Sequence, residues 1–295
     1  MIKNKAFIYG LAFMAVLWQG CWHEDLSGCD KNVVEISLGV ESLKGQNDPT
    51  DFAEEVDKAR FFIFDDSDGT LKDDGMVDVS SAEGAVCNLR LGEMELGKYT
   101  LVVVANDDKW CEGSELPLSA DSISVNTGMP VDKSSFVRRY SFSHECKCGY
   151  SDYVELYRTD ALVKLRLLNI PESLKSGTIT VNQVAEVCSA DTVFSGSANA
   201  DLHFSTSEAE NANIEKWFTV FPSTDEQGSY IWLHLNLDNN GAVENVSERI
   251  GRVFLKRNSV NEIVVDFNFG NPSDPEISVD VDREWDSTDN VIFDV

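Results

Sequence analysis

The sequence predicts an all-β protein with two β-sandwich domains in tandem. Short segments in which apolar and polar residues alternate recur along the chain, turn-forming Asp, Asn and Gly residues separate them, and helical periodicity is scarce. A length of 295 residues suits about two domains. Because 42% of the residues are hydrophobic and 10% are aromatic, the chain has enough apolar side chains to form packed cores.

The first set of predicted strands lies before residue 158. Residues 34–40 alternate strictly, so that four apolar side chains share one face, as a half-buried strand requires. Residues 61–64 are apolar throughout, which favours a central strand, and the acidic run 65–68 with Gly69 then predicts a tight turn. Further strands of this set are expected at 86–91, 99–105 and 136–142.

The second set of predicted strands follows residue 160. Its members share the same alternation and are expected at 162–168, 179–181, 230–237, 262–269, 277–281 and 291–295. The change from one set to the other falls between Tyr157 and Asp160. We therefore expect an N-terminal sandwich over residues 33–158 and a C-terminal sandwich over residues 159–295.

The N-terminus has the pattern of an export signal. Lys3 and Lys5 precede the apolar run 6–18, which is too short to cross a bilayer as a helix. We expect residues 1–20 to be a signal peptide.

Gly20 and Cys21 resemble the processing box of bacterial lipoproteins, in which the cysteine is acylated. We therefore expect residues 21–32 to form a linker lipidated at Cys21, which places the protein in the outer membrane. Glu24 and Asp25 resemble the signal that exports lipoproteins to the cell surface in Bacteroidota. The alternatives are a conventional signal peptide with a disulfide at Cys21, and a solvated acidic linker.

The charge balance argues against a nucleic-acid partner. The chain has 24 basic and 51 acidic residues, a formal charge of −27, and no stripe of Lys and Arg. Removal of residues 1–20 would take away Lys3 and Lys5 but no acidic residue, which leaves 22 − 51 = −29.

Seven cysteines fit an oxidising compartment. Assigning Cys21 to lipid leaves six, enough for three disulfides, whose pairing the sequence does not choose. His144, Cys146 and Cys148 form the densest group of metal-ligand residue types, but the second cysteine pair of a zinc site is missing. We expect disulfides or buried thiols there, and no metal or other cofactor.

Catalytic motifs are missing from the sequence. None of the nucleophile-elbow, P-loop, zinc-protease or dinucleotide-binding patterns occurs. The four histidines are scattered. A carboxylate pair for glycoside hydrolysis stays open among 51 acidic residues, but a non-enzymatic protein is the expectation.

One strand carries a candidate binding face. In residues 230–237 the side chains of Tyr230, Trp232 and His234 lie opposite the apolar ones. Exposed rings on a flat sheet would stack on sugars or pack against a protein partner. If both faces of the strand are buried, these side chains are structural instead.

Three segments carry a family resemblance: residues 21–29 (CWHEDLSGC), residues 55–65 (EVDKARFFIFD) and residues 96–105 (LGKYTLVVVA). They resemble the lipidated start, a strand with its turn, and a further strand of the fimbrillin-associated anchor lipoproteins of Bacteroidota, the minor-subunit family of type V fimbriae. The likeness is specific over roughly residues 17–110 and rests on strand pattern afterwards.

The resemblance implies two transthyretin-like β-sandwich domains and a role as fimbrial anchor or accessory subunit. It also implies fimbrial shaft or accessory subunits as partners, joined by β-strand complementation. In shaft subunits of the family, cleavage at an arginine removes the first strand. Here residues 40–58 contain Lys44 but no arginine, and the first arginine of the chain is Arg60. We therefore expect the strand at 34–40 to stay in place.

The C-terminus is the candidate joining element. In residues 289–295 the side chains of Val291, Phe293 and Val295 lie on one side, as in a strand donated to a neighbouring subunit. The alternative is a strand that closes its own sandwich.

Three short motifs resemble the O-glycosylation acceptor of the same bacteria, with Ser122, Thr192 and Ser287 as acceptors. The sequence thus predicts a surface-exposed fimbrial anchor or accessory lipoprotein. A surface glycan-binding lipoprotein of sandwich type is the alternative.

Overall fold

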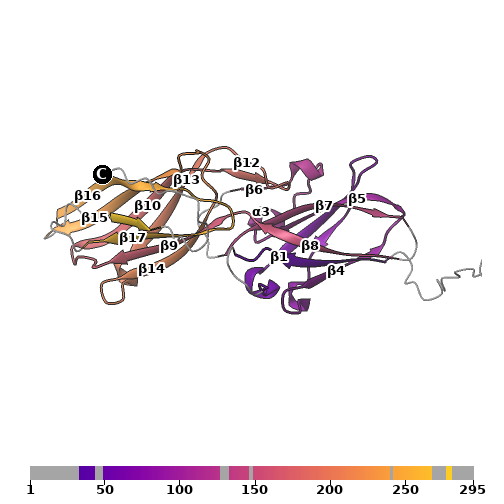
Figure 1. Cartoon of the computed structure of the whole chain (residues 1–295), viewed down its shortest axis with the longest axis horizontal. Coiled ribbons are helices and arrows are strands. Elements are labelled where there is room, and N and C mark those ends of the chain that lie inside the picture. Colours follow the sequence, from indigo (N-terminus) through magenta and orange to yellow (C-terminus); the bar gives the residue numbers. More distant parts are fainter. Residues whose placement is uncertain are drawn as a thin grey trace, which may run out of the picture.

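The computed structural model describes residues 33–43, 49–126, 133–145, 149–239, 242–267 and 277–280. Strands dominate this part of the chain, and the predicted all-β class is confirmed. Two strand assemblies lie end to end along the long axis (Figure 1). We call residues 33–158 the N-terminal half and the residues from 159 onward the C-terminal half. Within the described ranges, no helix has the length and apolar character needed to cross a membrane.

The N-terminal half is built from two sheets. Its strands are β1 (Val33–Val40), β2 (Ala59–Asp65), β3 (Leu71–Met76), β4 (Cys87–Glu93), β5 (Gly97–Ala105), β7 (Phe136–His144) and β8 (Tyr150–Arg158). Their hydrogen-bonded order is β3-β2-β5-β7-β8-β1-β4, which divides between β7 and β8 into the sheets β3-β2-β5-β7 and β8-β1-β4. Strands β7 and β8 pair only at Phe136↔Arg158 and Val137↔Tyr157, which joins the two sheets at one corner.

The C-terminal half repeats this plan. Its main strands are β9 (Ala161–Leu168), β10 (Leu174–Val184), β13 (Ala198–Ser205), β14 (Ile214–Val220), β15 (Ser229–Asn239), β16 (Ala242–Val253), β17 (Val260–Asp266) and β18 (Ile277–Asp280). They form the sheets β14-β9-β17-β18 and β13-β10-β15-β16. In both halves the first strand pairs antiparallel with the fourth and parallel with the seventh: β1 with β4 and β8, and β9 with β14 and β17.

Short helical segments connect the strands. They are α2 (Phe52–Glu55), α3 (Asp108–Cys111) and the 3₁₀ turns η2 (Val79–Ser81), η3 (Ala120–Ser122) and η4 (Thr206–Glu208). Helix α3 begins where the Asp107 side chain accepts a hydrogen bond from the Trp110 N–H, and Trp110 is buried.

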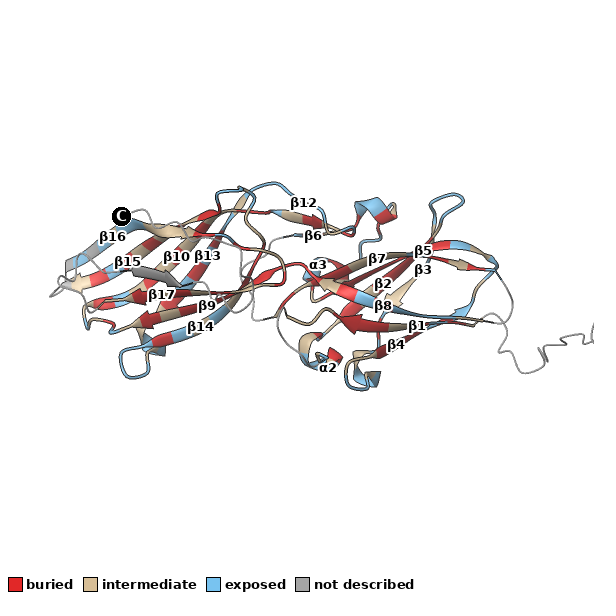
Figure 2. Cartoon of the chain, in the orientation of Figure 1, coloured by how far each residue is buried: buried red, intermediate tan, exposed pale blue. Residues whose placement is uncertain are grey.

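Each half has its own apolar core, which the alternation of its strands produces. In β1 the side chains of Val34, Ile36 and Leu38 are fully buried, while Glu35 between them is exposed. The matching residues Val163, Leu165 and Leu167 of β9 centre the C-terminal core. Figure 2 shows buried residues concentrated along the inner strands of both halves.

A third core joins the halves. Strands β2 and β5 are buried on both faces, and their outer-face residues Phe62, Phe64, Val102 and Val104 pack with Phe221 of the C-terminal half. Nearby, β6 (Ser124–Asn126) of the N-terminal half pairs with β11 (Val187–Ser189), which in turn pairs with β12 (Phe194–Ser195). Because this sheet and core include both halves, the division into two independent domains stays a prediction.

The predicted turn after residue 64 is confirmed as the β2–β3 hairpin. Asp65 Oδ1 accepts hydrogen bonds from the Ser67 N–H and hydroxyl at 2.9 and 2.6 Å, and Asp68 binds Thr70 in the same way. Gly69 has a positive φ of 70°, which glycine adopts at little cost. The acidic residues are therefore turn formers in this position.

Eight of the described strands were missed by the sequence prediction: β3, β6, β8, β11, β12, β13, β14 and β16. Most of them lie at sheet edges or expose one polar face, which weakens the apolar signal. In β3, for example, Leu71–Met76 includes Lys72, Asp73 and Asp74.

Three disulfides among the six remaining cysteines, which the sequence left open, are excluded. Cys87, Cys111 and Cys188 are not bonded to any cysteine. Cys87 lies in the N-terminal core and Cys188 lies in the third core. Apolar side chains of these two separate cores enclose the two thiols. Burial raises the pKa of Cys188 to about 12, which makes it an unreactive packing residue. Cys29, Cys146 and Cys148 lie outside the described residues.

Candidate functional site

Strand β1 occupies the central position of its sheet. It pairs antiparallel with β4 from Val33 to Leu38 and parallel with β8 from Val34 to Val40. Four of its side chains are at most 5% exposed: Val34, Ile36, Leu38 and Val40. Burial of such a side chain contributes about 1.5–3 kcal/mol, so loss of β1 would remove stability comparable to the roughly 5–15 kcal/mol of a whole domain. An empty β1 position would need another strand to fill it.

Arg60 is enclosed within β2. Its guanidinium pairs with Asp74 at 2.6 Å and donates to the Gly113 and Trp110 carbonyl oxygens at 2.8 and 3.2 Å. The side chain is 12% exposed, and β2 is paired on both edges. A protease that needs an extended, accessible arginine therefore has little access to Arg60.

The end of β1 contacts the C-terminal half. The Glu41 carboxylate accepts hydrogen bonds from both terminal nitrogens of Arg257, with Nη2 at 3.1 Å from Oε1, and from the Arg158 N–H at 3.2 Å. Arg257 Nη1 also donates to the Arg158 carbonyl at 3.0 Å, and Asn258 Nδ2 donates to the Ser42 carbonyl at 2.9 Å. The loop between β16 and β17 is thus hydrogen-bonded to the chain at the C-terminal ends of β1 and β8.

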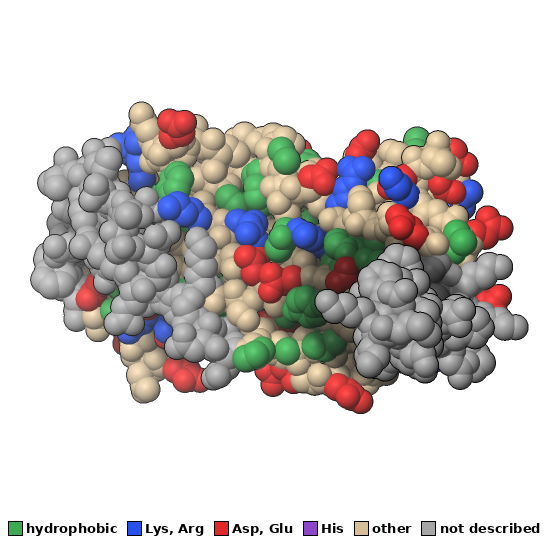
Figure 3. All heavy atoms as spheres, turned by 45° about the vertical axis from the view of Figure 1, so that its right-hand side comes forward, with side chains coloured by type: hydrophobic (Ala, Val, Ile, Leu, Met, Phe, Trp, Pro, Cys, Tyr) green, Lys and Arg blue, Asp and Glu red, His purple; other side chains and the backbone are tan. Residues whose placement is uncertain are grey.

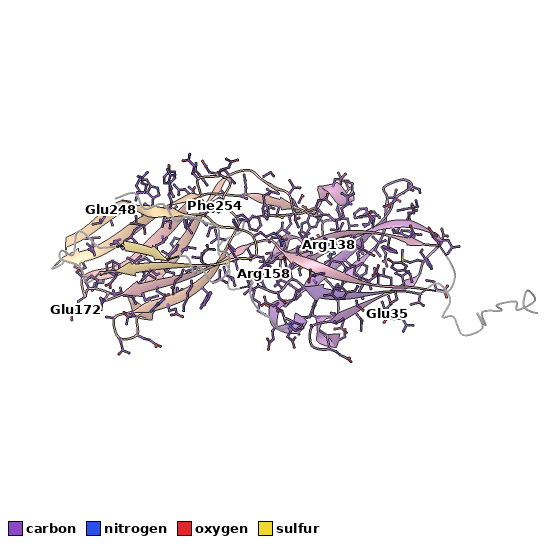
Figure 4. The ribbon with its side chains drawn as sticks, in the orientation of Figure 1. Glu35, Arg138, Arg158, Glu172, Glu248 and Phe254 are labelled. Carbon is purple, nitrogen blue, oxygen red and sulfur yellow. The ribbon has the colours of Figure 1, made fainter. Side chains whose placement is uncertain are left out.

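Buried charges lie behind this contact. Arg158 is 1% exposed, pairs with Glu55 at 3.1 Å and donates to the Ser134 hydroxyl. Figure 4 places Arg158 where the two halves meet. Asp160 is also buried, and this burial raises its pKa to about 6. Only Thr159 and Asp160 separate β8 from β9. The charged groups of Arg158 and Asp160 therefore lie at the connection between the two halves.

The Tyr230, Trp232 and His234 side chains share the open face of the β13-β10-β15-β16 sheet. All three are half-buried, and none belongs to the apolar core. The Tyr230 hydroxyl accepts a hydrogen bond from Arg252, whose guanidinium lies 4.1 Å from the ring centroid. His234 Nδ1 is hydrogen-bonded to the Ser247 hydroxyl.

Polar pairs surround these rings. They are hydrogen bonds between neighbouring strands: Thr178 to His203 at 2.9 Å, Thr180 to Asp201 at 2.6 Å and Asn236 to Ser176 at 2.9 Å. The face therefore offers aromatic surface bordered by hydroxyl, amide and imidazole groups. Its role in binding stays a prediction.

Two of the three predicted glycosylation motifs come together. Arg139 Nη1 pairs with Asp121 at 2.5 Å and with Asp191 at 3.1 Å, so the neighbouring Ser122 and Thr192 lie on either side of one arginine, although they belong to different halves. Ser122 is exposed and Thr192 half-buried. Both aspartates of the motifs are occupied by this ion pair.

Charged side chains of both signs are interspersed on the molecular face in Figure 3. Several pair at the surface, including Lys216 with Glu208 at 2.5 Å and Lys133 with Asp57 at 2.6 Å. Such exposed pairs contribute about 0–1 kcal/mol each. These pairs neutralise single acidic side chains at the surface and contribute little to the stability of the fold.

The described residues contain no group of three or more His, Cys, Asp and Glu side chains that could hold a metal. His144 is buried at the end of β7, with Nδ1 3.2 Å from the Glu95 carbonyl oxygen. Its predicted neighbours in a thiol cluster, Cys146 and Cys148, lie outside the described residues.

Several predicted site residues also lie outside the described residues. They are Cys21, Glu24, Asp25, Ser287, Val291, Phe293 and Val295.

The sequence prediction missed the contacts of Glu41, Arg158 and Arg257. For Arg158 the sequence does contain a signal, because the charged residues of the segment Arg158-Thr159-Asp160 lie between two segments of alternating polarity. No local pattern links Glu41 to Arg257, which are 216 residues apart.

Comparison with known proteins shows which solved structures have a similar fold. No family model and no curated protein matches the chain. A candidate adhesin from Bacteroides ovatus matches with a TM-score of 0.57 at 13% identity, over 85% of this chain and 93% of that one. The fimbrial anchor protein Mfa2 from Porphyromonas gingivalis matches with a TM-score of 0.52 at 12% identity, over 83% and 95%. The chain has the fold of these Bacteroidota adhesins and fimbrial anchors.

A third structure with this fold is a candidate polysaccharide-binding protein from Bacteroides thetaiotaomicron, with a TM-score of 0.54 at 9% identity over 79% of this chain and 91% of that one. The resemblance drawn from the N-terminal motifs is confirmed at the level of the fold. At these identities the likeness concerns the fold alone.

Proposed function

We propose that the chain is the anchor or a minor subunit of a type V fimbria and has no enzymatic activity. The observation that carries this proposal is the position of β1, which fills the centre of its sheet in a chain with the fold of a fimbrial anchor. A subunit that keeps this strand has no vacant β1 position for a donated one. It therefore is not extended by a strand that takes the place of β1.

Retention of β1 follows from the proposal. Arg60 is enclosed by Asp74 and two carbonyl oxygens, and Glu41 at the end of β1 is held by Arg257. We expect the mature protein to begin at the lipidated Cys21. Mass spectrometry of the protein from its own cells determines the mature N-terminus. A mature N-terminus within residues 41–60 would contradict the retention of β1.

Attachment to the outer membrane would come from the lipid on Cys21, with Glu24 and Asp25 directing the protein to the cell surface. The mature charge of −29 would repel an anionic surface, so the folded part would not bind the membrane by itself. The Cys21→Ser variant should release fimbriae into the medium. The Cys29→Ser variant, in the same linker, is the control and should keep them attached. Fimbriae that stay attached in the Cys21→Ser strain contradict the anchoring role.

The joining element would be the C-terminal segment, donated through Val291, Phe293 and Val295. Deletion of residues 289–295 should abolish co-purification with fimbrial subunits while the circular dichroism spectrum stays that of a folded β protein. Loss of folding would favour the alternative, in which the segment closes its own sandwich.

A second candidate function is glycan binding by the open face around Trp232. The observation that favours it is an aromatic row bordered by hydrogen-bonding groups such as Asn236 and His203. Trp232→Ala should abolish binding on a glycan array. The control is Trp217→Ala, since Trp217 is 44% exposed on β14 in the other sheet. Equal binding by both variants and the unmodified protein would contradict this function.

A further inference from the structure

Strand β16 brings two arginines to the face of the sheet that carries Tyr230 and Trp232. Tyr230 pairs with Arg252, and Trp232 pairs with Arg249, three residues earlier in the chain. Strict alternation would put residues three apart on opposite faces of the sheet. A β-bulge between these two pairs adds one residue to β16, which turns both arginines to the same face. A basic row of β16 therefore lies beside the aromatic row of β15.

Both guanidinium groups contact the Tyr230 ring. The central carbon of the group lies 4.1 Å from the ring centroid in Arg252 and 5.1 Å in Arg249. Such a contact attracts a cation to the face of the ring, but the ring has no net charge and does not neutralise the cation. The Tyr230 ring thus holds positive charge at the surface of the sheet.

Arg252 has no carboxylate partner among the described residues. Its Nη1 donates to the Gln227 side-chain carbonyl at 3.1 Å and its Nη2 donates to the Tyr230 hydroxyl, and both of these acceptors are neutral. Its Nε is buried without a hydrogen bond. Most of the N–H donors of this guanidinium are therefore unused within the described part of the chain.

Other arginines of the protein pair with carboxylates. Five of them do so: Arg60, Arg139, Arg158, Arg166 and Arg257. Such pairing is expected in a chain with 51 acidic and 24 basic residues. Even the acid nearest in sequence to Gln227 is engaged elsewhere, since Asp225 accepts a hydrogen bond from the Gln227 N–H at 2.8 Å. The unneutralised guanidinium of Arg252 is thus a donor for an anion from outside the chain.

The neighbours of Arg252 favour an acidic sugar as the source of that anion. Trp232 follows Tyr230 on the same face of β15, about 7 Å further along the strand, and a ring of this kind stacks on the apolar face of a sugar. The exposed Asn236 and the half-buried His234 continue the row with groups that bind hydroxyls. The acid Asp201 accepts a hydrogen bond from Thr180 at 2.6 Å and lies on β13, two strands away from β15. It therefore leaves the basic row free of a nearby opposing charge from β13.

We propose that this face binds a carboxylate-bearing polysaccharide, such as one built from uronic acids, with a sugar ring stacked on Trp232 and a carboxylate on Arg252. The inference rests on glycan binding, the second function proposed above, and specifies the class of glycan. The net charge of −27 repels a polyanion as a whole. A preference for acidic over neutral sugar must therefore come from the local basic row.

Paired polysaccharides test the proposal on the unmodified full-length protein. The acidic probes are polygalacturonate, alginate and hyaluronan. Each is compared with its carboxyl-reduced form, in which every carboxylate is a hydroxymethyl group and the sugar rings are unchanged. We expect at least one acidic probe to bind at least about tenfold more tightly than its reduced form, because only the acidic probe makes charge-assisted hydrogen bonds to Arg252. Biolayer interferometry measures the affinities.

The Arg252→Gln variant should lose this difference and should bind the reduced probe as the unmodified protein does. The control is Arg166→Gln, because Arg166 lies on β9 in the other sheet, is 40% exposed and pairs with Glu262 at 3.3 Å. It should bind both forms of the probe like the unmodified protein. Circular dichroism of both variants verifies that each is folded.

Three results overturn the proposal. The first is that no acidic probe binds more tightly than its reduced form. The second is that Arg252→Gln and Arg166→Gln change the affinities equally. The third is that poly-glutamate displaces the acidic probe and binds the Trp232→Ala variant unchanged, which would assign the basic row to an acidic protein.

These outcomes are distinct from failure of the glycan function itself. If the reduced probes bind as tightly as the acidic ones, and Trp232→Ala abolishes both, glycan binding stands and the preference for acidic sugars is wrong. If no probe of either form binds, glycan binding by this face is wrong, and the inference fails with it.

Discussion

Asp160 is a buried acid on the two-residue connection between the halves. One carboxylate oxygen accepts a hydrogen bond from the Ser135 N–H at 2.9 Å, and the other has no hydrogen bond. Burial raises the pKa from 3.8 to about 6, with partial compensation from the hydrogen bonds and from Arg158. Because the folded state holds a proton that the unfolded state releases, the stability that this group contributes is full below pH 4 and is lost as the pH rises to about 6.

The Asp160→Asn variant should therefore be more stable than the unmodified protein at pH 7.5. A pKa rise from 3.8 to about 6 corresponds to up to about 3 kcal/mol. The difference should shrink as the pH falls from 6 to 4, because the protonated acid resembles the amide. Urea denaturation across this pH range measures it.

Asp68→Asn is the control for that experiment. Asp68 is exposed, and hydrogen bonds from Thr70 lower its pKa, so its pH effect has the opposite sign. The amide should give no stabilisation at pH 7.5. Parallel pH profiles for the Asp160→Asn variant and the unmodified protein would show that Asp160 is not strained by burial.

Gly177 allows two strands to pack closely. A Cβ atom there would lie 2.3 Å from the Phe204 ring and 2.7 Å from the His234 carbonyl oxygen. Gly177→Ala should cost about 1–3 kcal/mol, because the overlap includes backbone that cannot move freely. In Gly92→Ala, the control, the added methyl group meets nothing within 4 Å. Thermal denaturation of both variants measures the difference, and equal losses would contradict the argument.

Among the elements, β2 and β5 contribute alternate side chains to two cores. In β2, Phe61 and Ile63 point into the N-terminal core, whereas Phe62 and Phe64 point into the third core. This is why residues 61–64 are apolar without interruption. Strand β1, in contrast, alternates because its outer face meets solvent.

Phe62→Ala should destabilise the protein by about 3–5 kcal/mol, as removal of a fully buried ring does. The ring meets Trp110 edge-on, with centroids 5.6 Å apart. Met76→Ala on the neighbouring β3 is the control, since Met76 is 52% exposed, and it should cost under about 0.5 kcal/mol. Guanidinium denaturation measures both. A loss for Phe62→Ala as small as that for Met76→Ala would mean that the third core is not packed.

At the scale of the whole molecule, the described residues show three kinds of contact between the halves. The third core buries apolar side chains from both, β6 pairs with β11 across the boundary, and the Glu41–Arg257 pair binds the end of β1 to the β16–β17 loop. The connection itself is too short to act as a flexible linker. The two halves should behave as one rigid rod, which the proposed anchoring role would require.

The halves should therefore unfold together. We expect hydrogen–deuterium exchange under increasing denaturant to expose β5 of the N-terminal half and β10 of the C-terminal half at the same denaturant concentration. Phe221→Ala, in the C-terminal half, should lower that concentration for β5 as well. Two separate transitions, with β5 unaffected by Phe221→Ala, would show that the halves are independent domains.

Much of the fold follows from the sequence because strand alternation is a local property. Ten of the described strands show it or a continuous apolar run in the sequence, and the first strand at 34–40 matches β1 closely. Edge strands such as β3 and β16 escaped prediction because their residues are mostly polar. The Tyr230, Trp232 and His234 face was placed correctly on one side of β15 for the same reason that β1 was: a period of two fixes the face.

The sequence by itself determined the all-β class, the inner strands and the family whose fold the chain shares. Only the tertiary structure decided which charges meet at the junction and which apolar residues form the third core. The physical reason is range. Alternation, turns and sorting motifs act over a few neighbouring residues, whereas Glu41 and Arg257 or Phe62 and Phe221 meet only when the sheets stack and bring distant parts of the chain into contact.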